Sequence, residues 1–376
     1  MRQHIDQERI TEQFLKLVEI DNPSLAERKM ADEVRHQLDE LGVFYTEDET
    51  WRETGGNAGN IFATVPGTLP GGAVLLSAHL DSVAPAVGKR GILHEDGTIT
   101  SAGDTVLGSD DLAGVAEILE LVRCLKEQQI PHRPLELWFT YGEELYSIGG
   151  ARFDFTQIRA EEAYVLDATG APGIFLYKAP TILSFEIRVR GKASHAGFAP
   201  ERGIHAIRIC AEAISQVKIG HLDEETTVNI GEISGGAGTN IVPELCTVRG
   251  EIRSYVHEKA LEQLERLRGL FQKTAEQVGG SAEFLWRIGC HAYEIRMDSP
   301  SVQNFRRVCD ERSHPFMPQA SFGGSDNNAL AEHGIEGIVL SCGMEQVHTT
   351  QEYTTVRALT ETTEMLVALV TGTMAE

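Results

Sequence analysis

The sequence predicts an α/β protein with a mostly parallel sheet, helices on both faces of it, and an inserted ferredoxin-like α+β domain. Three observations support this class. Short apolar runs alternate with helical patterns at both ends of the chain, whereas the middle carries strands in which apolar and polar residues alternate. The length of 376 residues is sufficient for two domains, or for one large domain with an insertion.

The outer parts of the chain predict the parallel sheet. Two helices are expected within residues 6–41, and another at 112–127, where apolar residues recur at helical spacing. Strands are expected at the short apolar runs, which are residues 60–65, 73–78, 135–141, 163–168 and 335–341. Uninterrupted apolar runs of this length are typical of strands buried on both faces, as in parallel sheets.

The middle of the chain predicts the inserted domain. Its expected elements are strands at 182–191, 226–234, 246–254 and 282–289, and helices at 203–217 and along an apolar stripe from Leu261 to Val278. The order strand, helix, strand, strand, helix, strand is that of a ferredoxin-like unit. We therefore predict a catalytic domain of residues 1–178 and 295–376, and an inserted lid or dimerisation domain of residues 179–294.

Composition narrows the possible functions. The net charge of −23 argues against binding to nucleic acid or to anionic membrane surfaces. The apolar runs are too short to span a bilayer, and the amino terminus lacks the apolar core of a signal peptide. Six scattered cysteines without a CxxC pair indicate reduced thiols, so a cytoplasmic location is expected.

Polar side chains follow the predicted strands at the points where these strands end. They are His79 and Asp81, Glu143 and Glu144, Asp167, and His348, with Asp110 and Asp111 just before the helix at 112–127. In open α/β sheets, ligands bind outside the carboxyl ends of the strands. Each group alone has an ordinary structural interpretation, such as a helix N-cap or a solvated surface pair. Their convergence on one edge of the sheet indicates a functional site.

The residue types suit a pair of divalent metal ions. Histidine nitrogen and carboxylate oxygen are ligands of zinc, and two neighbouring metals need a bridging carboxylate and can share an activated water. A carboxylate that is not bound to metal suits the role of general base for that water. Asp81 is expected to accept the second ring N–H of His79 and so to fix its tautomer.

The motifs SAHLDSV, TVLGSDDLAGVAEI, FTYGEELYSIGGARF, AYVLDA, GKASHAGFAPERGIHAI, TNIVPE and VHTTQEY occur in this order over essentially the whole chain. This set resembles the di-zinc exopeptidases and amidohydrolases related to peptidase T, carboxypeptidase G, aminoacylase and carnosinase. The segment DTVLGSDDLAG is most similar to peptidase T-like proteins. The resemblance implies a zinc-exopeptidase-like catalytic domain, a small peptide substrate and a homodimer formed through the inserted domain.

The resemblance also implies a role for each site residue. Asp110 would bridge two metals, His79 and Asp167 would complete one site, and Glu144 and His348 would complete the other. Glu143 would be the general base, Asp81 would orient His79, and His195 would help to stabilise the oxyanion, in the partner subunit's site. The implied substrate-binding residues are Asn240, Arg253, Gly324 and Ser325. The implied cofactor is two divalent ions per chain, with Zn²⁺ expected first and Co²⁺ or Mn²⁺ as alternatives.

Two positions depart from the family pattern. Leu112 stands where peptidase T-like sequences usually carry lysine, and Tyr146 replaces a glycine that is common after the two glutamates. Neither is an implied metal ligand, so these departures concern the substrate preference.

The leading hypothesis is a metal-dependent tripeptide aminopeptidase. A carboxypeptidase or an N-acyl-amino-acid amidohydrolase could use the same metal centre, and a non-catalytic binding protein is a further alternative. The sequence does not separate a free peptide from an acylated amino acid as the natural substrate.

Overall fold

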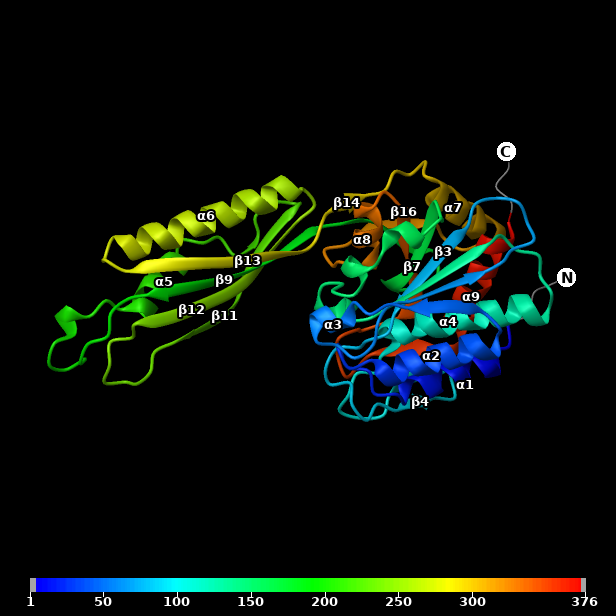
Figure 1. The fold of residues 1–376 in the computed structure, drawn as a ribbon, viewed down its shortest axis with the longest axis horizontal. Coiled ribbons are helices and arrows are strands. Elements are labelled where there is room, and N and C mark those ends of the chain that lie inside the picture. The colour runs from blue at the N-terminus through cyan, green and yellow to red at the C-terminus, as the bar shows by residue number, and fades with distance from the viewer. Residues whose placement is uncertain (1–4, 373–376) are drawn as a thin grey trace. The chain divides into compact units, whose positions relative to one another are not determined.

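The computed structural model describes residues 5–372, and its chain divides into two compact units (Figure 1). The first contains the described residues up to Lys178, together with Glu294–Ser321 and the described residues from Ser325 onward. The second contains Ala179–Tyr293 and Phe322–Gly324.

The first unit is built on a nine-stranded sheet. Its strands, in spatial order, are β1 (Phe44–Glu47), β2 (Ile61–Val65), β6 (Leu135–Thr140), β3 (Val74–His79), β7 (Glu162–Thr169), β16 (Glu336–Met344), β8 (Ile174–Ala179) and β14 (Tyr293–Glu294), with β15 (Met317–Ala320) beside β8. The four central strands β6, β3, β7 and β16 run parallel, whereas the β1–β2, β2–β6 and β16–β8 pairs are antiparallel. The expected mostly parallel sheet is confirmed.

Helices cover both faces of this sheet. The helices of the first unit are α1 (Gln7–Val18), α2 (Arg28–Glu40), α3 (Trp51–Thr54), α4 (Ser109–Glu127), α7 (Pro300–Arg312), α8 (Asp326–Glu332) and α9 (Val356–Thr371). α4 packs between α1 and α9 and contacts β3. On the opposite face, Leu330 of α8 joins a core with Trp138 and Val165, beside the short turns η2 (Gly150–Arg152) and η3 (Phe155–Gln157).

A small second sheet joins distant parts of the chain in the first unit. Its three antiparallel strands are β17 (Tyr353–Thr355), β5 (Thr98–Ser101) and β4 (Gly91–Leu93). This sheet fixes the segment that precedes α9, which places residues 345–352 near the start of α4.

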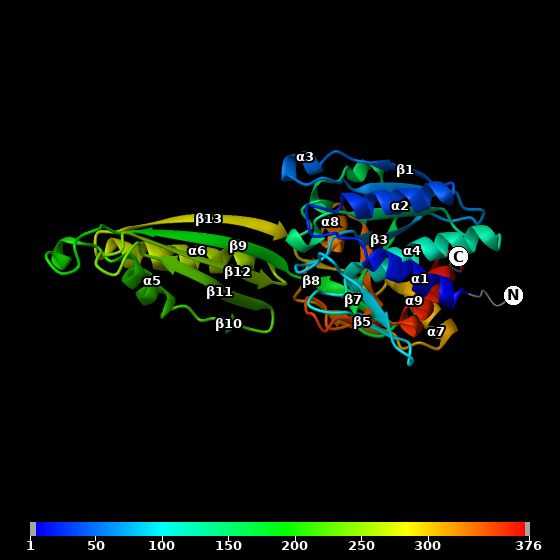
Figure 2. The ribbon, with the colours of Figure 1, turned by 90° about the horizontal axis from the view of Figure 1, so that it is seen from below.

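The second unit is the expected ferredoxin-like domain. Its antiparallel sheet has the order β10 (Gly220–His221), β11 (Thr226–Gly235), β12 (Leu245–Ser254), β9 (Thr181–Arg190) and β13 (Ser281–Cys290). The turn η4 (Pro200–Arg202) and the helix α5 (Ala206–Ile214) follow β9, and α6 (His257–Glu276) follows β12 (Figure 2). Alternate residues of β9, among them Leu183 and Phe185, bury against α5 and α6. The apolar stripe of α6 is shorter than expected, because the helix ends at Glu276 and Val278 is half exposed.

The opposite face of this sheet is charged. Arg249 lies 2.6 Å from Glu186 and 3.1 Å from Glu232, and Arg188 pairs with the same Glu186. This ladder of ion pairs keeps the face compatible with water.

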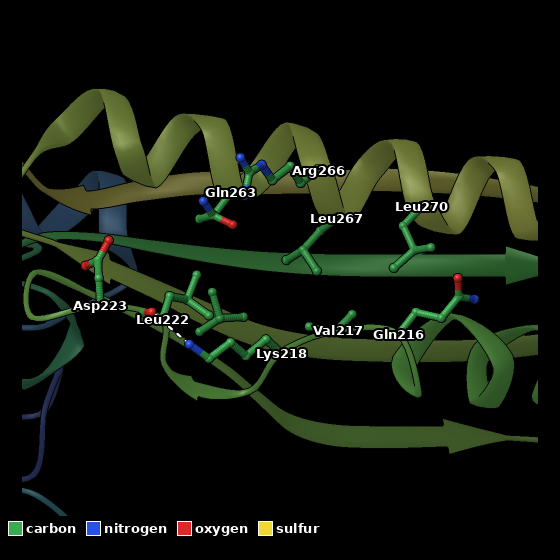
Figure 3. Close-up of a pocket in the computed structure, with 10 residues that line it drawn as sticks. Gln216, Val217, Lys218, Leu222, Asp223, Gln263, Arg266, Leu267 and Leu270 are labelled. Atoms are coloured by element: carbon green, nitrogen blue, oxygen red, sulfur yellow. Dashed lines mark hydrogen bonds between the residues drawn. The ribbon is translucent and has the colours of Figure 1, made fainter.

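A hollow of about 410 Å³ lies between α6 and the segment that joins α5 to β11 (Figure 3). Leu267 and Leu270 of α6 form one wall, and Val217 and Leu222 form another. The ammonium of Lys218 donates to the main-chain carbonyl of Leu222 at 2.8 Å. This hydrogen bond joins two residues of the same wall of the hollow.

Candidate metal centre

The carboxyl ends of the central strands bring the predicted ligands together. His79 ends β3 opposite Thr140 of the parallel strand β6, and Glu143 and Glu144 follow β6 directly. Asp167 lies near the end of β7. Parallel strands end at the same edge of a sheet, which explains why residues far apart in the chain meet there.

Asp110 lies between the two histidines. Its Oδ1 is 3.0 Å from His79 Nε2, and its Oδ2 is 3.2 Å from His348 Nε2. Glu144 Oε2 is 3.1 Å from the same nitrogen of His348, and Asp167 Oδ1 is 3.9 Å from His79 Nε2. Each oxygen of Asp110 therefore faces a different histidine, which is the arrangement that a bridging carboxylate needs.

The pKa values reflect these contacts. Burial would lower the pKa of His79, but its hydrogen bonds to Asp110 and Asp81 outweigh burial and raise that pKa well above its usual value. Asp110 and Glu144 raise the pKa of His348 to about 10. Burial raises the pKa of Glu144, and likewise the pKa of Asp167, where the neighbouring carboxylates add to the effect.

The donor set fits divalent cations. His79, Asp110 and Glu144 can direct one ligand atom each to a common point, and so can His79, Glu143 and Asp167, with these atoms within 4.8 Å of one another. Glu144 Oε1 is buried and has no hydrogen-bond partner among the residues that the structure describes. Crowded carboxylates with raised pKa values and an unpaired buried oxygen are stabilised by positive charge.

The two glutamates lie in a short 3₁₀ turn, η1 (Glu143–Leu145), and not on the strand itself. Gly142 precedes the turn with a φ of 62°, a left-handed conformation that glycine adopts readily. Glu144 points to His348, whereas Glu143 Oε1 accepts a hydrogen bond of 3.1 Å from the hydroxyl of Ser147. The neighbouring side chains therefore separate because of this turn, not because strand residues alternate.

Asp81 makes different contacts from those expected. His79 Nδ1 lies 3.0 Å from the main-chain carbonyl oxygen of Asp81, and 3.4 Å from its carboxylate. The carboxylate accepts the main-chain N–H groups of Glu143 at 2.9 Å and of Glu144 at 3.2 Å, and the hydroxyl of Ser24 at 2.7 Å. Asp81 thus contacts His79 mainly through its backbone and holds the η1 turn with its side chain.

A second buried carboxylate holds the loop that carries Asp110. Glu352 accepts the N–H of Gly108 at 2.8 Å, the hydroxyl of Ser109 at 2.7 Å and the N–H of Asp110 at 2.9 Å. Asp111, next in the chain, accepts the N–H of His79 at 3.0 Å. The main chain around Asp110 is therefore fixed from two sides.

The second unit contains His195 and Asn240 on adjoining loops. His195 and Ile241 form an isolated antiparallel β-bridge, and the N–H of Ala196 donates to the carbonyl of Asn240 at 3.0 Å. His195 Nδ1 accepts the N–H groups of Gly197 and Phe198, both at 3.1 Å. Because Nδ1 is an acceptor, the proton of a neutral imidazole lies on Nε2, which can donate to another molecule.

The other predicted substrate residues already have protein partners. Arg253 binds both carboxylate oxygens of Glu251, at 2.8 and 3.0 Å, and donates to the carbonyl of Phe322 at 2.7 Å. Ser325 caps α8, with Asn328 completing the capping box. Gly324 belongs to the second unit, and Ser325 belongs to the first.

The two departures from the family pattern differ in their surroundings. Leu112 is fully buried in α4. Tyr146 is half-buried and has a φ of 64°, so the backbone there keeps the conformation that favours glycine although the residue is tyrosine.

Three supporting residues were missed by the sequence prediction: Ser147, Asp326 and Glu352. Ser147 and Glu352 lie inside recognised motifs, because Ser147 is in FTYGEELYSIGGARF and Glu352 is the second-last residue of VHTTQEY, and Asp326 directly follows Ser325. Their roles depend on contacts between segments far apart in the chain, which the motifs do not specify.

Known proteins resemble this chain over its whole length. A model of the peptidase dimerisation domain matches residues 177–279, and a model of peptidase family M28 matches residues 60–177. The Bacillus subtilis (strain 168) protein YqjE is 36% identical over 97% of this chain and 98% of its own length.

Two solved structures share the fold closely. A tripeptidase from Staphylococcus aureus subsp. aureus Mu50 has a TM-score of 0.93 and 32% identity, with 98% of both chains covered. Aminopeptidase PepT from Bacillus cereus ATCC 10987 has a TM-score of 0.89 and 36% identity, again with 98% of both chains covered. No helix among the described residues is long and apolar enough to cross a membrane.

Proposed function

Because the chain belongs to the exopeptidase family that includes peptidase T, we propose that it is a di-metal aminopeptidase that removes the first residue of tripeptides. The observation that carries this proposal is the position of Asp110 between His79 and His348, with the carboxylate of Glu143 beside them. The similar tripeptidase and aminopeptidase PepT structures support the substrate class.

The proposed metal ligands are those that converge at the strand ends. Asp110 would hold both ions, His79 and Asp167 would be the further ligands of one, and Glu144 and His348 would be those of the other. When bound, the ions supply Lewis acidity, which polarises the substrate carbonyl and makes a shared water more acidic. The mixed histidine and carboxylate set suits Zn²⁺, and it also accepts Co²⁺ or Mn²⁺.

We assign proton transfer to Glu143. Burial and the nearby carboxylates Asp326, Glu144 and Asp81 raise its pKa well above the usual value. A carboxylate of raised basicity can take a proton from the attacking water and deliver it to the leaving amine. His195 of a partner subunit, whose Nδ1 is already an acceptor, donates its Nε2–H to the oxyanion of the tetrahedral species.

Substrate recognition is assigned to Asn240, Arg253, Gly324 and Ser325. A guanidinium is suited to bidentate binding of the peptide's terminal carboxylate. Because Arg253 is held by Glu251, a substrate carboxylate must compete with that ion pair.

The enzyme is proposed to work as a cytoplasmic homodimer joined through the second unit. The match to a dimerisation domain and the strongly exposed Phe198 and Ile233 of that unit support the dimer. The six free cysteines are consistent with a reducing compartment. Sedimentation should give twice the monomer mass, and a fully active monomer would contradict this assembly.

The decisive test of the proton-transfer role is Glu143→Gln in the metal-loaded enzyme. Tripeptide turnover should fall by about 10²–10⁴-fold while the bound metal stays unchanged, because Gln cannot accept the proton. Glu136→Gln, which changes a buried glutamate of β6 held by the N–H groups of Arg159 and Ala160, is the matched control. Undiminished turnover with full metal content would exclude Glu143 as the base.

The substrate class is tested by comparing a tripeptide with its N-acetylated form. An aminopeptidase needs the free amine and should cleave only the unmodified peptide. Preferential cleavage of acylated substrates would instead identify an amidohydrolase that uses the same centre.

A further inference from the structure

Asp326 is a buried carboxylate beside the proposed centre that has no part in the mechanism above. It is 1% exposed and begins α8. Its Oδ2 accepts the hydroxyl of Thr140, the last residue of β6, which lies opposite His79. Asp326 therefore lies against the strand end that leads into the two glutamates.

The second oxygen of Asp326 faces the segment after the η1 turn, at Gly150. Oδ1 is buried and has no well-formed hydrogen bond among the described residues, although the hydroxyl of Ser147 is near enough to lower the pKa of Asp326. A β-carbon on Gly150 would lie only 2.3 Å from Oδ1, so the glycine at this position allows the carboxylate to approach. Burial is the stronger effect and raises the pKa of Asp326 to about 6.

Ser147, three residues before Gly150, contacts Glu143 directly. Its N–H donates to the carbonyl of Glu143 at 2.7 Å, and its hydroxyl donates to Glu143 Oε1 at 3.1 Å. Ser147 is buried and has a φ of 49°, a left-handed conformation that is unfavourable for residues other than glycine. Such strain at a residue that contacts a reacting group indicates a functional constraint.

We infer that Ser147 and Asp326 are positioning residues for the general base: Ser147 fixes the carboxylate of Glu143 through its hydroxyl, and Asp326, held by Thr140, lies against Gly150 of the same segment. This inference deepens the proposed function and rests on Glu143 being the base. The hydroxyl of Ser147 has one hydrogen, and by giving it to Oε1 it fixes the rotamer of Glu143 and leaves Oε2 free for the proton of the water. Asp326, itself held by Thr140, occupies the space beside Gly150 and so limits how far the segment 147–150 can move.

The first test removes each link separately in the metal-loaded enzyme. Ser147→Ala deletes the hydroxyl at the same backbone strain, and Asp326→Asn keeps the volume and an acceptor for Thr140. Each should lower kcat for a tripeptide by about 10- to 100-fold, with KM changed less than about 2-fold and metal content unchanged. Glu136→Gln again serves as the buried-carboxylate control. An unchanged kcat in both variants, or a loss of rate that follows loss of metal, would overturn the inference.

The second test asks whether the links act as one chain. The double variant Ser147→Ala/Asp326→Asn should lower kcat no more than the more damaging single variant does. The reason is that the effects of substitutions in one shared set of contacts do not add. Thr140→Val should lower kcat, and Thr140→Ser should restore it, because only the hydroxyl matters. Additive losses, or equal rates for Val and Ser at position 140, would contradict a shared route.

These outcomes are distinct from failure of the proposed function. If the native enzyme cleaves no tripeptide, or if Glu143→Gln keeps full turnover, the proposed function fails. If the native enzyme is active and depends on Glu143 but the Ser147 and Asp326 variants are unaffected, only the positioning role fails.

Discussion

At the scale of single residues, Glu117 of α4 shows a conflict between charge and burial. It is fully buried, and neither of its carboxylate oxygens has a hydrogen-bond partner among the described residues. Burial raises its pKa well above the usual value, and the charge of Asp111 adds to the effect. An unpaired buried carboxylate is costly in its ionised form, so the folded state holds Glu117 as the neutral acid.

This conflict predicts how stability depends on pH. Because the pKa of Glu117 is higher in the folded state, that state binds more protons, and stability falls as pH rises from the unfolded pKa of about 4.3. Glu117→Gln should remove this contribution and raise Tm by roughly 2–4 °C near pH 8, with little change near pH 4. Thermal unfolding of the native protein and of Glu117→Gln between pH 4 and pH 8 measures this difference in Tm. If the two curves of Tm against pH run parallel, the pKa of Glu117 does not differ between the folded and unfolded states.

The left-handed backbone at Tyr146 shows what the sequence could not specify. The sequence identified this position as a departure from a glycine, but not that the departure leaves a tyrosine at a φ of 64°. A non-glycine residue in this conformation costs about 1–2 kcal/mol.

At the scale of elements, the strand ends could be predicted from the sequence, but the contacts that hold the loops after them could not. The apolar runs identified β3, β6, β7 and β16, and every proposed metal ligand except Asp110 lies near or after the end of one of these strands. The turn η1 was not predictable, because its shape depends on Gly142 and on the carboxylate of Asp81 across the sheet edge. The actual contacts of Asp81 were missed for the same reason: main-chain donors leave no mark in the sequence.

The loop before α4 depends on an element from the far end of the chain. Glu352 accepts two N–H groups and one hydroxyl from residues 108–110, and the small sheet holds the adjoining strand β17. Glu352→Ala should leave these donors unpaired, lower the free energy of unfolding by about 3 kcal/mol and weaken metal binding about 10- to 100-fold. Denaturant titration and metal titration measure the two effects. Glu361→Gln, in an exposed pair with Arg357 on α9, is the control and should change neither quantity appreciably.

At the scale of the whole molecule, the proposed metals would join segments from most of the first unit. Their ligands lie between His79 and His348, and the second unit is inserted between Asp167 and His348. A metal ion that binds only the folded state stabilises that state, by about 4 kcal/mol when the concentration of free ion is a thousand times its Kd. A chelator should therefore lower Tm, and Zn²⁺, Co²⁺ or Mn²⁺ should restore it, as calorimetry can measure. Equal Tm values for metal-loaded and metal-depleted protein would show that the cluster does not hold the fold.

The division of the chain also sets the order in which its parts can be completed during synthesis. The second unit is almost continuous, from Ala179 to Tyr293, whereas the first is assembled from both ends of the chain. Because a ribosome releases the amino-terminal part first, the inserted sheet can form while His348 and α9 are still missing. Peptide hydrolysis is then the last property that a growing chain acquires. A product that stops before His348 lacks the cluster, although its dimerisation domain is complete.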